Sequence, residues 1–162
     1  MSESLIKADT ALESLRSSDF DTCSAYGEVI DNSIQANASK IWIYLKERTD
    51  RTRSRKSQIG QAVFVDNGDR MSHGDLHKCL KLGHSSRYND RSGIGRFGVG
   101  MTLGAIHEAR RIEVYSKKDT GNWQWTYIDL DEILGKDDAS IPKPINKKPE
   151  LDGSVDLDSL SS

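Results

Sequence analysis

Glu28 and Asn32 are the residues whose types and spacing best fit catalysis in this chain. They stand four residues apart in a segment with helical periodicity, so their side chains lie next to each other on one turn. The Asn32 oxygen suits a hard cation such as Mg²⁺, and the Glu28 carboxylate can orient or deprotonate a water for attack on a phosphate. Taken alone, the same residues also fit a solvated helix face that includes Asp31 and Gln35.

A glycine-rich stretch at 93–100, GIGRFGVG, is the second candidate. Its first three glycines satisfy the dinucleotide-binding spacing G-x-G-x-x-G, but a polar stretch rather than a strand precedes them. Residues 95–102 also approach a P-loop, although Met101 stands where the lysine of that motif belongs. Both motifs bind phosphate through features that this stretch still has. Glycines let backbone N–H groups approach phosphate oxygens, and the N-terminus of the following helix favours negative charge, so the stretch still fits a phosphate-binding loop. An ordinary surface loop is the alternative.

The third candidate is Asp66-Asn67-Gly68, which directly follows the apolar run AVFV at 62–65. The run predicts a buried strand, so Asp66 is placed at its carboxyl end with a turn after it. A carboxylate there can accept a hydrogen bond from an exocyclic amine, and Gly68 lets a flat ring approach the backbone. Read in isolation, Asn-Gly is a turn signal and nothing more.

The elements that must position these residues follow from the hydrophobic pattern. Helical spacing predicts helices at 3–17, 20–36, 72–83 and 101–107, with Ser72 and Asp75 forming a capping box at the start of the third. β-branched and aromatic residues predict strands at 40–45, 62–65, 111–116 and 123–130. The first two are expected to be buried, and the last two are joined as a hairpin. After Asp131 the pattern is lost, so residues 136–162 are expected to be an irregular segment or linker, and the chain a fragment truncated before a second domain.

Composition limits the class of protein. The chain has 162 residues, of which 35% are hydrophobic and 30% charged, with a net charge of −2; these values are typical of one soluble globular domain. The charge disfavours a dedicated nucleic-acid binder, and the basic stretch at 46–56 is read as a solvated loop. Cysteines and histidines show no metal-ligand spacing, and the N-terminus lacks the apolar core of a secretory signal. We expect a cytoplasmic protein without a membrane span.

Three ordered motifs, EVIDNS at 28–33, DNGDRM at 66–71 and GIGRFGVGM at 93–101, resemble those of the GHKL superfamily of Bergerat-fold ATPases. That superfamily includes gyrase, the ninety-kilodalton heat-shock chaperones, histidine kinases and MutL, and the stretches at 14–41 and 80–86 are especially similar to MORC proteins and their bacterial relatives. The resemblance implies an α+β fold, a two-layer α/β sandwich with a mixed sheet covered on one face by helices. It implies an ATP-binding domain at 1–135, with a strap helix at 1–18 and an ATP lid at 83–100.

The resemblance also implies roles for the motif residues. Glu28 would be the general base, Asn32 the Mg²⁺ ligand, and Asp66 the acceptor of the adenine amino group. The other implied nucleotide contacts are Gly68 and Met71 at the adenine, and Ser85, Ser86, Gly93, Gly95, Arg96, Phe97, Gly98, Val99, Gly100 and Met101 in and after the lid. Arg70 departs from the family pattern because it replaces a second glycine, and Gln35 replaces an acidic residue.

Three functions remain open at this point. The first is Mg-ATP binding and hydrolysis that drives homodimerisation of a larger machine, which acts on DNA or a client protein through a downstream domain. The second is a nucleotide-gated binding or sensor module with little or no hydrolysis, because family ATPases draw a catalytic lysine from a following transducer domain that these residues do not include. The third, a kinase that phosphorylates histidine, is disfavoured by the Asp31-Asn32 pair and the form of the glycine motif.

Overall fold

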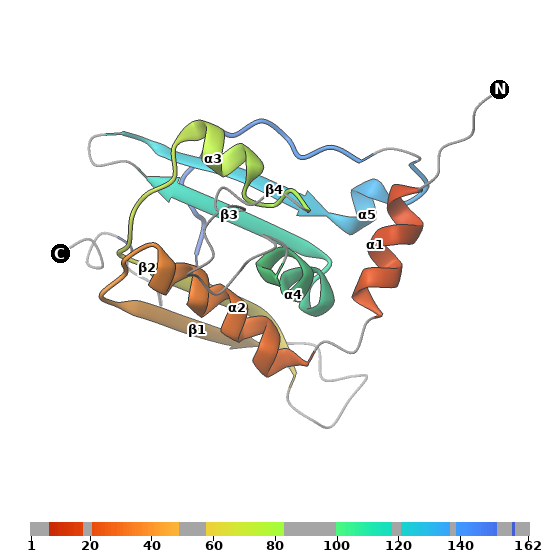
Figure 1. Ribbon diagram of the computed structural model, residues 1–162, viewed down its shortest axis with the longest axis horizontal. Coiled ribbons are helices and arrows are strands. Elements are labelled where there is room, and N and C mark those ends of the chain that lie inside the picture. The colour runs from red at the N-terminus through yellow and green to blue at the C-terminus, as the bar shows by residue number, and fades with distance from the viewer. Residues whose placement is uncertain are drawn as a thin grey trace, which may run out of the picture. The chain divides into compact units, whose positions relative to one another are not determined.

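The computed structural model describes residues 7–17, 21–48, 58–82, 100–117, 121–136, 139–151 and 157. The elements are, in order, α1 (Ala8–Arg16), α2 (Thr22–Gln35), β1 (Ile41–Glu47), β2 (Ile59–Asp66), α3 (His73–Lys78), α4 (Gly100–Glu108), β3 (Arg111–Lys117), β4 (Trp123–Asp129), α5 (Leu130–Ile133) and β5 (Ile145–Asn146) (Figure 1). They divide into a first unit, residues 1–32 and 70–149, and a second unit, residues 33–69 and 150–162. We describe each by itself.

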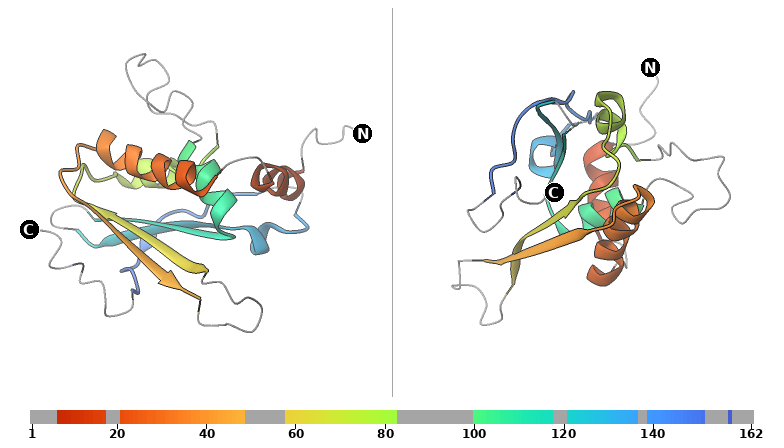
Figure 2. Two further views of the ribbon diagram at one scale, coloured as in Figure 1. Left: turned by 90° about the horizontal axis from the view of Figure 1, so that it is seen from below. Right: turned by 90° about the vertical axis from the view of Figure 1, so that its left-hand side faces the viewer.

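The first unit is built on a three-stranded antiparallel sheet in the order β3-β4-β5. β3 and β4 pair along their whole length, which confirms the predicted hairpin. One face of the sheet packs against helices, with α3 and α4 on the same side of the strands (Figure 2). The buried core of this unit joins α1, the turn after α3, α4, the end of β4 and α5 through Leu12, Leu80, Ile106, Ile128 and Leu130.

The N-terminal helix α1 belongs to this core. Leu12 is only 9% exposed in the hydrophobic cluster. Arg110, just after α4, holds the helix from outside, since its guanidinium lies 3.0 Å from the Glu13 carboxylate of α1 and 2.7 Å from Asp131 of α5. The described part of the expected strap therefore packs within its own unit.

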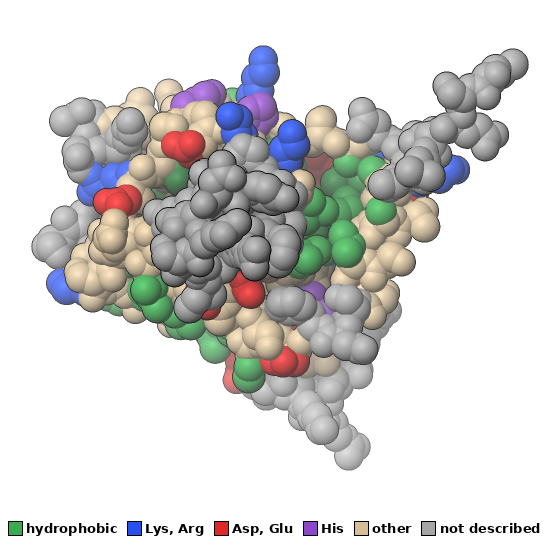
Figure 3. All heavy atoms as spheres, in the orientation of Figure 1, with side chains coloured by type: hydrophobic (Ala, Val, Ile, Leu, Met, Phe, Trp, Pro, Cys, Tyr) green, Lys and Arg blue, Asp and Glu red, His purple; other side chains and the backbone are tan. Residues whose placement is uncertain are grey.

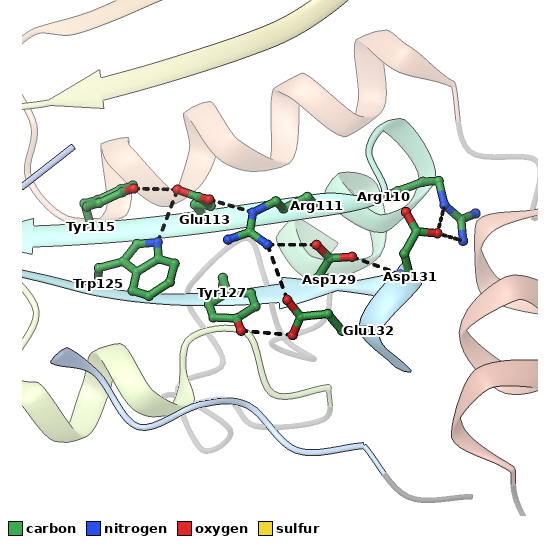
Figure 4. Close-up of polar contacts among 9 residues, drawn as sticks. All are labelled: Arg110, Arg111, Glu113, Tyr115, Trp125, Tyr127, Asp129, Asp131 and Glu132. Carbon is green, nitrogen blue, oxygen red and sulfur yellow. Dashed lines mark hydrogen bonds and ion pairs between the residues drawn. The ribbon is translucent and has the colours of Figure 1, made fainter. Parts of the chain in front are cut away.

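The other face of the same sheet carries a cross-strand ladder of aromatic and charged side chains (Figure 4). Trp125 stacks on Tyr127 with ring centroids 4.7 Å apart, and Arg111 lies 4.5 Å above the Tyr127 ring. Arg111 also pairs with Glu113 and Asp129 at 2.7 and 2.8 Å. Such pairs stabilise neighbouring strands, so Trp125 contributes to the packing on this face of the sheet.

The second unit contains a two-stranded antiparallel sheet, β1 with β2, in which Ile41 lies opposite Asp66. Both strands are found where the sequence predicts them, but the prediction that they are buried is wrong for one face. Ile43, Leu45 and Ile59 share that face and are 43%, 53% and 48% exposed. β-branched and aromatic residues favour a strand because their side chains fit the pleated backbone. Their presence does not show whether other parts of the protein pack on both faces of that strand.

The α+β class is confirmed, and the sheet differs in detail from the expected one. Every strand pairing among the described residues is antiparallel, and these strands form two sheets rather than one mixed sheet. β1 with β2 and β3 with β4 are consecutive strands, which hairpin connections pair antiparallel, whereas parallel pairs need longer crossovers. The assignment of 1–135 as a domain and 136–162 as a linker stays a prediction.

Helix and strand ends account for the other differences. Ser72 caps α3 by accepting from the Asp75 N–H, as the capping box predicts, but the helix ends at Lys78. There the Lys81 N–H bonds to the Lys78 carbonyl three residues back, which tightens the last turn and ends the helix. The four-residue α5 and the two-residue β5 were not predicted, because such short elements carry no measurable periodicity.

Within the described ranges, no helix has the length and apolar character needed to cross a membrane.

Candidate functional site

The Asp66 carboxylate is held in one orientation by both of its oxygens. Asp66 is the last residue of β2, as the sequence predicts. Its Oδ2 accepts a hydrogen bond from Ser33 Oγ at 3.0 Å, and its Oδ1 accepts one from the Gly68 N–H at 2.9 Å. Ser33 is buried, at 5% exposure, whereas Asp66 is exposed. Each carboxylate oxygen has a second lone pair, so the fixed group can still accept from an amine.

Gly68 brings the turn after β2 against the chain that follows α2. A Cβ at this position would lie 2.6 Å from the Ala36 carbonyl oxygen and 3.0 Å from Asp66 Oδ1. The neighbouring Asp69 N–H donates to the same Ala36 carbonyl at 2.5 Å. No side chain fits between these groups, which gives a physical reason for glycine here beyond the turn signal.

Asn67 and Asn37 fasten this turn further. Asn67 Oδ1 accepts from the N–H groups of Ser39 and Lys40 at 3.0 and 2.9 Å. Asn37 has a left-handed backbone, with φ of 59°, and its side chain donates to Asp69 Oδ2 at 2.6 Å. Sequence reasoning missed these supports. A usable signal existed for Asn37, because asparagine just after a helix commonly takes the left-handed conformation that ends it.

Arg70 is the departure from the family motif, and it leaves the backbone unstrained. Among the described non-glycine residues only Asn37 has a positive φ, so position 70 does not require the left-handed backbone that favours glycine. The Arg70 side chain is exposed.

Glu28 and Asn32 lie on one turn of α2, as their spacing predicts. Asp21 accepts hydrogen bonds from the backbone and side chain of Ser24, which caps the start of this helix and holds the pKa of Asp21 below its usual value. The Asn32 side-chain nitrogen donates to the Glu28 backbone carbonyl at 2.8 Å, which leaves the Asn32 side-chain oxygen available. No described residue forms a hydrogen bond or ion pair with the half-buried Glu28 carboxylate.

The start of α4 lies next to Glu28 within the first unit. α4 begins at Gly100, and the Glu28 carboxylate occupies the space where a Gly100 side chain would stand. The half-buried Met101 side chain packs against the hydrophobic core, and its backbone N–H lies in the first turn of α4. A helix start presents unpaired N–H groups and a partial positive charge, which favour phosphate.

Met71 and the lid residues complete the predicted set. The Met71 N–H donates to Ser116 Oγ on β3 at 3.0 Å, which ties its backbone to the first unit's sheet. The predicted contacts at Ser85, Ser86, Gly93, Gly95, Arg96, Phe97, Gly98 and Val99 lie outside the described residues.

The histidines do not form a metal site in the described part of the chain. His77 Nε2 lies 3.1 Å from the Ile141 carbonyl, and His107 Nδ1 lies 3.1 Å from Glu108. Histidine and cationic side chains gather over α3 in the space-filling view (Figure 3), and α3 contains His73, His77 and Lys78. Among described residues there is no group of three or more His, Cys, Asp or Glu placed to hold a metal. Mg²⁺ commonly takes only one or two protein oxygens beside waters and phosphates, so Asn32 still fits it.

Residues 21–159 match the family of histidine kinase-, DNA gyrase B- and HSP90-like ATPases. The chain belongs to this family. Membership makes it a nucleotide-binding domain of the GHKL type, and the three motifs in which Glu28, Asp66 and Gly100 stand all fall within the matched range.

Individual relatives of this GHKL domain include ATPases and a repair protein. ATPase MORC2B of Mus musculus is 30% identical over 123 residues, and Protein MICRORCHIDIA 1 of Arabidopsis thaliana is 28% identical over 126 residues. DNA mismatch repair protein MutL of Borreliella afzelii (strain PKo) is 26% identical over 137 residues. These matches cover 74%, 73% and 82% of the chain but only 11%, 19% and 20% of the relatives. The chain thus spans between about a tenth and a fifth of their length.

Proposed function

We propose that this GHKL domain binds Mg-ATP and hydrolyses it, with Glu28 as general base and Asn32 as a ligand of Mg²⁺. The observation that carries the proposal is the placement of two oxygen-bearing side chains on one turn of α2, with the Glu28 carboxylate beside the start of α4. The oxygen groups suit the cation and the attacking water, and the helix start suits a phosphate. Magnesium would neutralise charge on the transferred phosphoryl group; Glu28 would take the proton of the water.

In the second unit we assign Asp66 to the adenine amino group. The support is the fixed carboxylate, which Ser33 and Gly68 orient and which is exposed. Gly68 and Met71 are assigned to the adenine pocket, and the backbone of Gly100 and Met101 to the phosphates. The remaining phosphate contacts are assigned to the lid residues named above.

For the whole protein we propose nucleotide-dependent homodimerisation coupled to action on DNA or a client protein. The support is the similarity to MORC ATPases and to a DNA mismatch repair protein, each of them several times longer than this chain. The alternative is a nucleotide-gated sensor with little or no hydrolysis. Tight binding of ATP by the full-length protein without release of phosphate distinguishes this alternative from the ATPase.

Calorimetry with Mg-ATP and a non-hydrolysable analogue tests the binding. We expect the wild-type chain to bind, and Asp66→Asn to weaken binding by about 10- to 150-fold, which corresponds to about 1.5–3 kcal/mol for a hydrogen bond to a charged group. Asp69→Asn is the control, because Asp69 receives its hydrogen bond from Asn37. A chain that binds no nucleotide, or an Asp66→Asn variant with unchanged affinity, contradicts the assignment.

Phosphate release by the full-length protein tests the catalytic role. Removing a general base commonly lowers the rate by about 10²- to 10⁴-fold, so Glu28→Ala should lose most of its turnover while retaining affinity for Mg-ATP. An unchanged rate in this variant would remove Glu28 from the mechanism while leaving nucleotide binding intact.

A further inference from the structure

Gly100 and Glu28 occupy neighbouring space in the first unit. A Cβ built on Gly100 would overlap the Glu28 carboxylate, since it would lie 2.9 Å from Oε1 and closer still to Oε2 and the carboxyl carbon. The absence of a side chain at position 100 is therefore what makes room for the carboxylate in its present position.

The usual conformational reason for glycine does not apply here. Gly135 is the one glycine with a positive φ among the described residues, so Gly100 has a backbone that alanine adopts without strain. Gly100 stands in α4, where alanine is intrinsically favoured over glycine by about 1 kcal/mol. The approach of Glu28 opposes a side chain at this position, since the three atoms nearest to a Cβ there all belong to the Glu28 carboxylate.

The group that would have to move is the end of a flexible side chain. Glu28 can swing its carboxylate away by rotating its side-chain torsions, without any shift of α2 or α4. Gly68 differs in this respect, because the atom nearest to a Cβ there is the backbone oxygen of Ala36. A methyl group at position 100 should therefore redirect Glu28 at little cost in stability.

We propose that Gly100 is a positioning residue for Glu28: by lacking a side chain, it leaves room for the carboxylate beside the first turn of α4, where the carboxylate reaches the attacking water. The inference rests on the proposed function of Glu28 as general base. A general base must lie within hydrogen-bond distance of the proton that it takes. A displacement of about 1 Å can cost about a hundredfold in rate.

The test compares Gly100→Ala with Gly27→Ala. Gly27 precedes Glu28 on α2, and a Cβ there would meet no atom within 4 Å, so it is a matched control. For Gly100→Ala we expect kcat to fall by about 10- to 100-fold, while the Kd for Mg-ATP and the melting temperature stay close to wild type. Alanine keeps the backbone N–H that we assign to phosphate. Gly27→Ala should retain kcat.

A second experiment shortens the side chain that carries the carboxylate at position 28. Glu28→Asp removes one methylene and withdraws the carboxylate from the space that a methyl group at 100 would fill. Alone, Glu28→Asp should lower kcat; in the Gly100→Ala background it should lower kcat much less. The fold-losses of the two single variants, multiplied together, should exceed the loss in the double variant.

The outcomes separate this inference from the function on which it rests. A wild-type chain that does not bind Mg-ATP refutes the proposed function. A full-length wild-type protein that binds Mg-ATP but releases no phosphate refutes the role of Glu28 and this inference with it. With an active wild type, an unchanged kcat in Gly100→Ala, or a loss that appears equally in Kd or in Gly27→Ala, overturns the positioning role and leaves the ATPase function standing.

Discussion

Replacing Gly68 with alanine should destabilise the chain, because the new methyl group has no room. Its Cβ would lie 2.6 Å from the Ala36 carbonyl oxygen, 3.0 Å from Asp66 Oδ1 and 3.1 Å from the Ala36 Cβ. Two of these atoms belong to Ala36, whose carbonyl also accepts from the Asp69 N–H, and the third belongs to a carboxylate bonded to Ser33. The turn has to shift as a whole. Inserting a methyl group into such packing typically costs about 1–3 kcal/mol.

Urea unfolding followed by circular dichroism measures the effect. We expect Gly68→Ala to lower the free energy of unfolding by about 1–3 kcal/mol with an unchanged m-value, and to weaken binding of Mg-ATP because Asp66 moves with the turn. Gly74→Ala is the matched control, because its Cβ would meet only Ser72 Oγ, at 3.9 Å. A Gly68→Ala variant as stable as wild type would refute the reasoning that the close approach to Ala36 requires glycine.

Two further predictions concern ionisable groups. Burial acts to raise the pKa of Glu113, but hydrogen bonds from Tyr115 and Arg111 outweigh it and hold that pKa below its usual 4.5. The free energy of unfolding should therefore fall as the pH drops below about 4.5, and Glu113→Gln should reduce this dependence in acid titrations monitored by fluorescence. Burial raises the pKa of Cys79 to about 12, whereas Cys23 is exposed. Alkylation at pH 8 should label Cys23 and spare Cys79 in the native chain, and equal labelling by mass spectrometry would contradict the burial.

The sequence predicts most of the fold's elements because their signals are local. Ser72 and Asp75 form the capping box that predicts the start of α3. Alternating apolar and polar residues on either side of a short turn predict β3 and β4. Exposure is not local, because it depends on what packs against a strand after folding. This is why Ile43 and Leu45 are correctly placed in β1 and wrongly expected to be buried.

In the candidate site too, local features could be predicted from the sequence and contacts between distant residues could not. The types and spacing of Glu28, Asn32 and Asp66 are enough to propose their chemistry, since a carboxylate and an amide at helical spacing suit a cation and a water wherever the helix lies. Their supports depend on contacts between residues distant in sequence. Ser33 meets Asp66 33 positions away, and Glu28 meets Gly100 only through the packing of α2 and α4. The sequence motif shows that a carboxylate is present at Glu28. The position of that carboxylate depends on the space that Gly100 leaves by having no side chain, and this space is seen only in the folded chain.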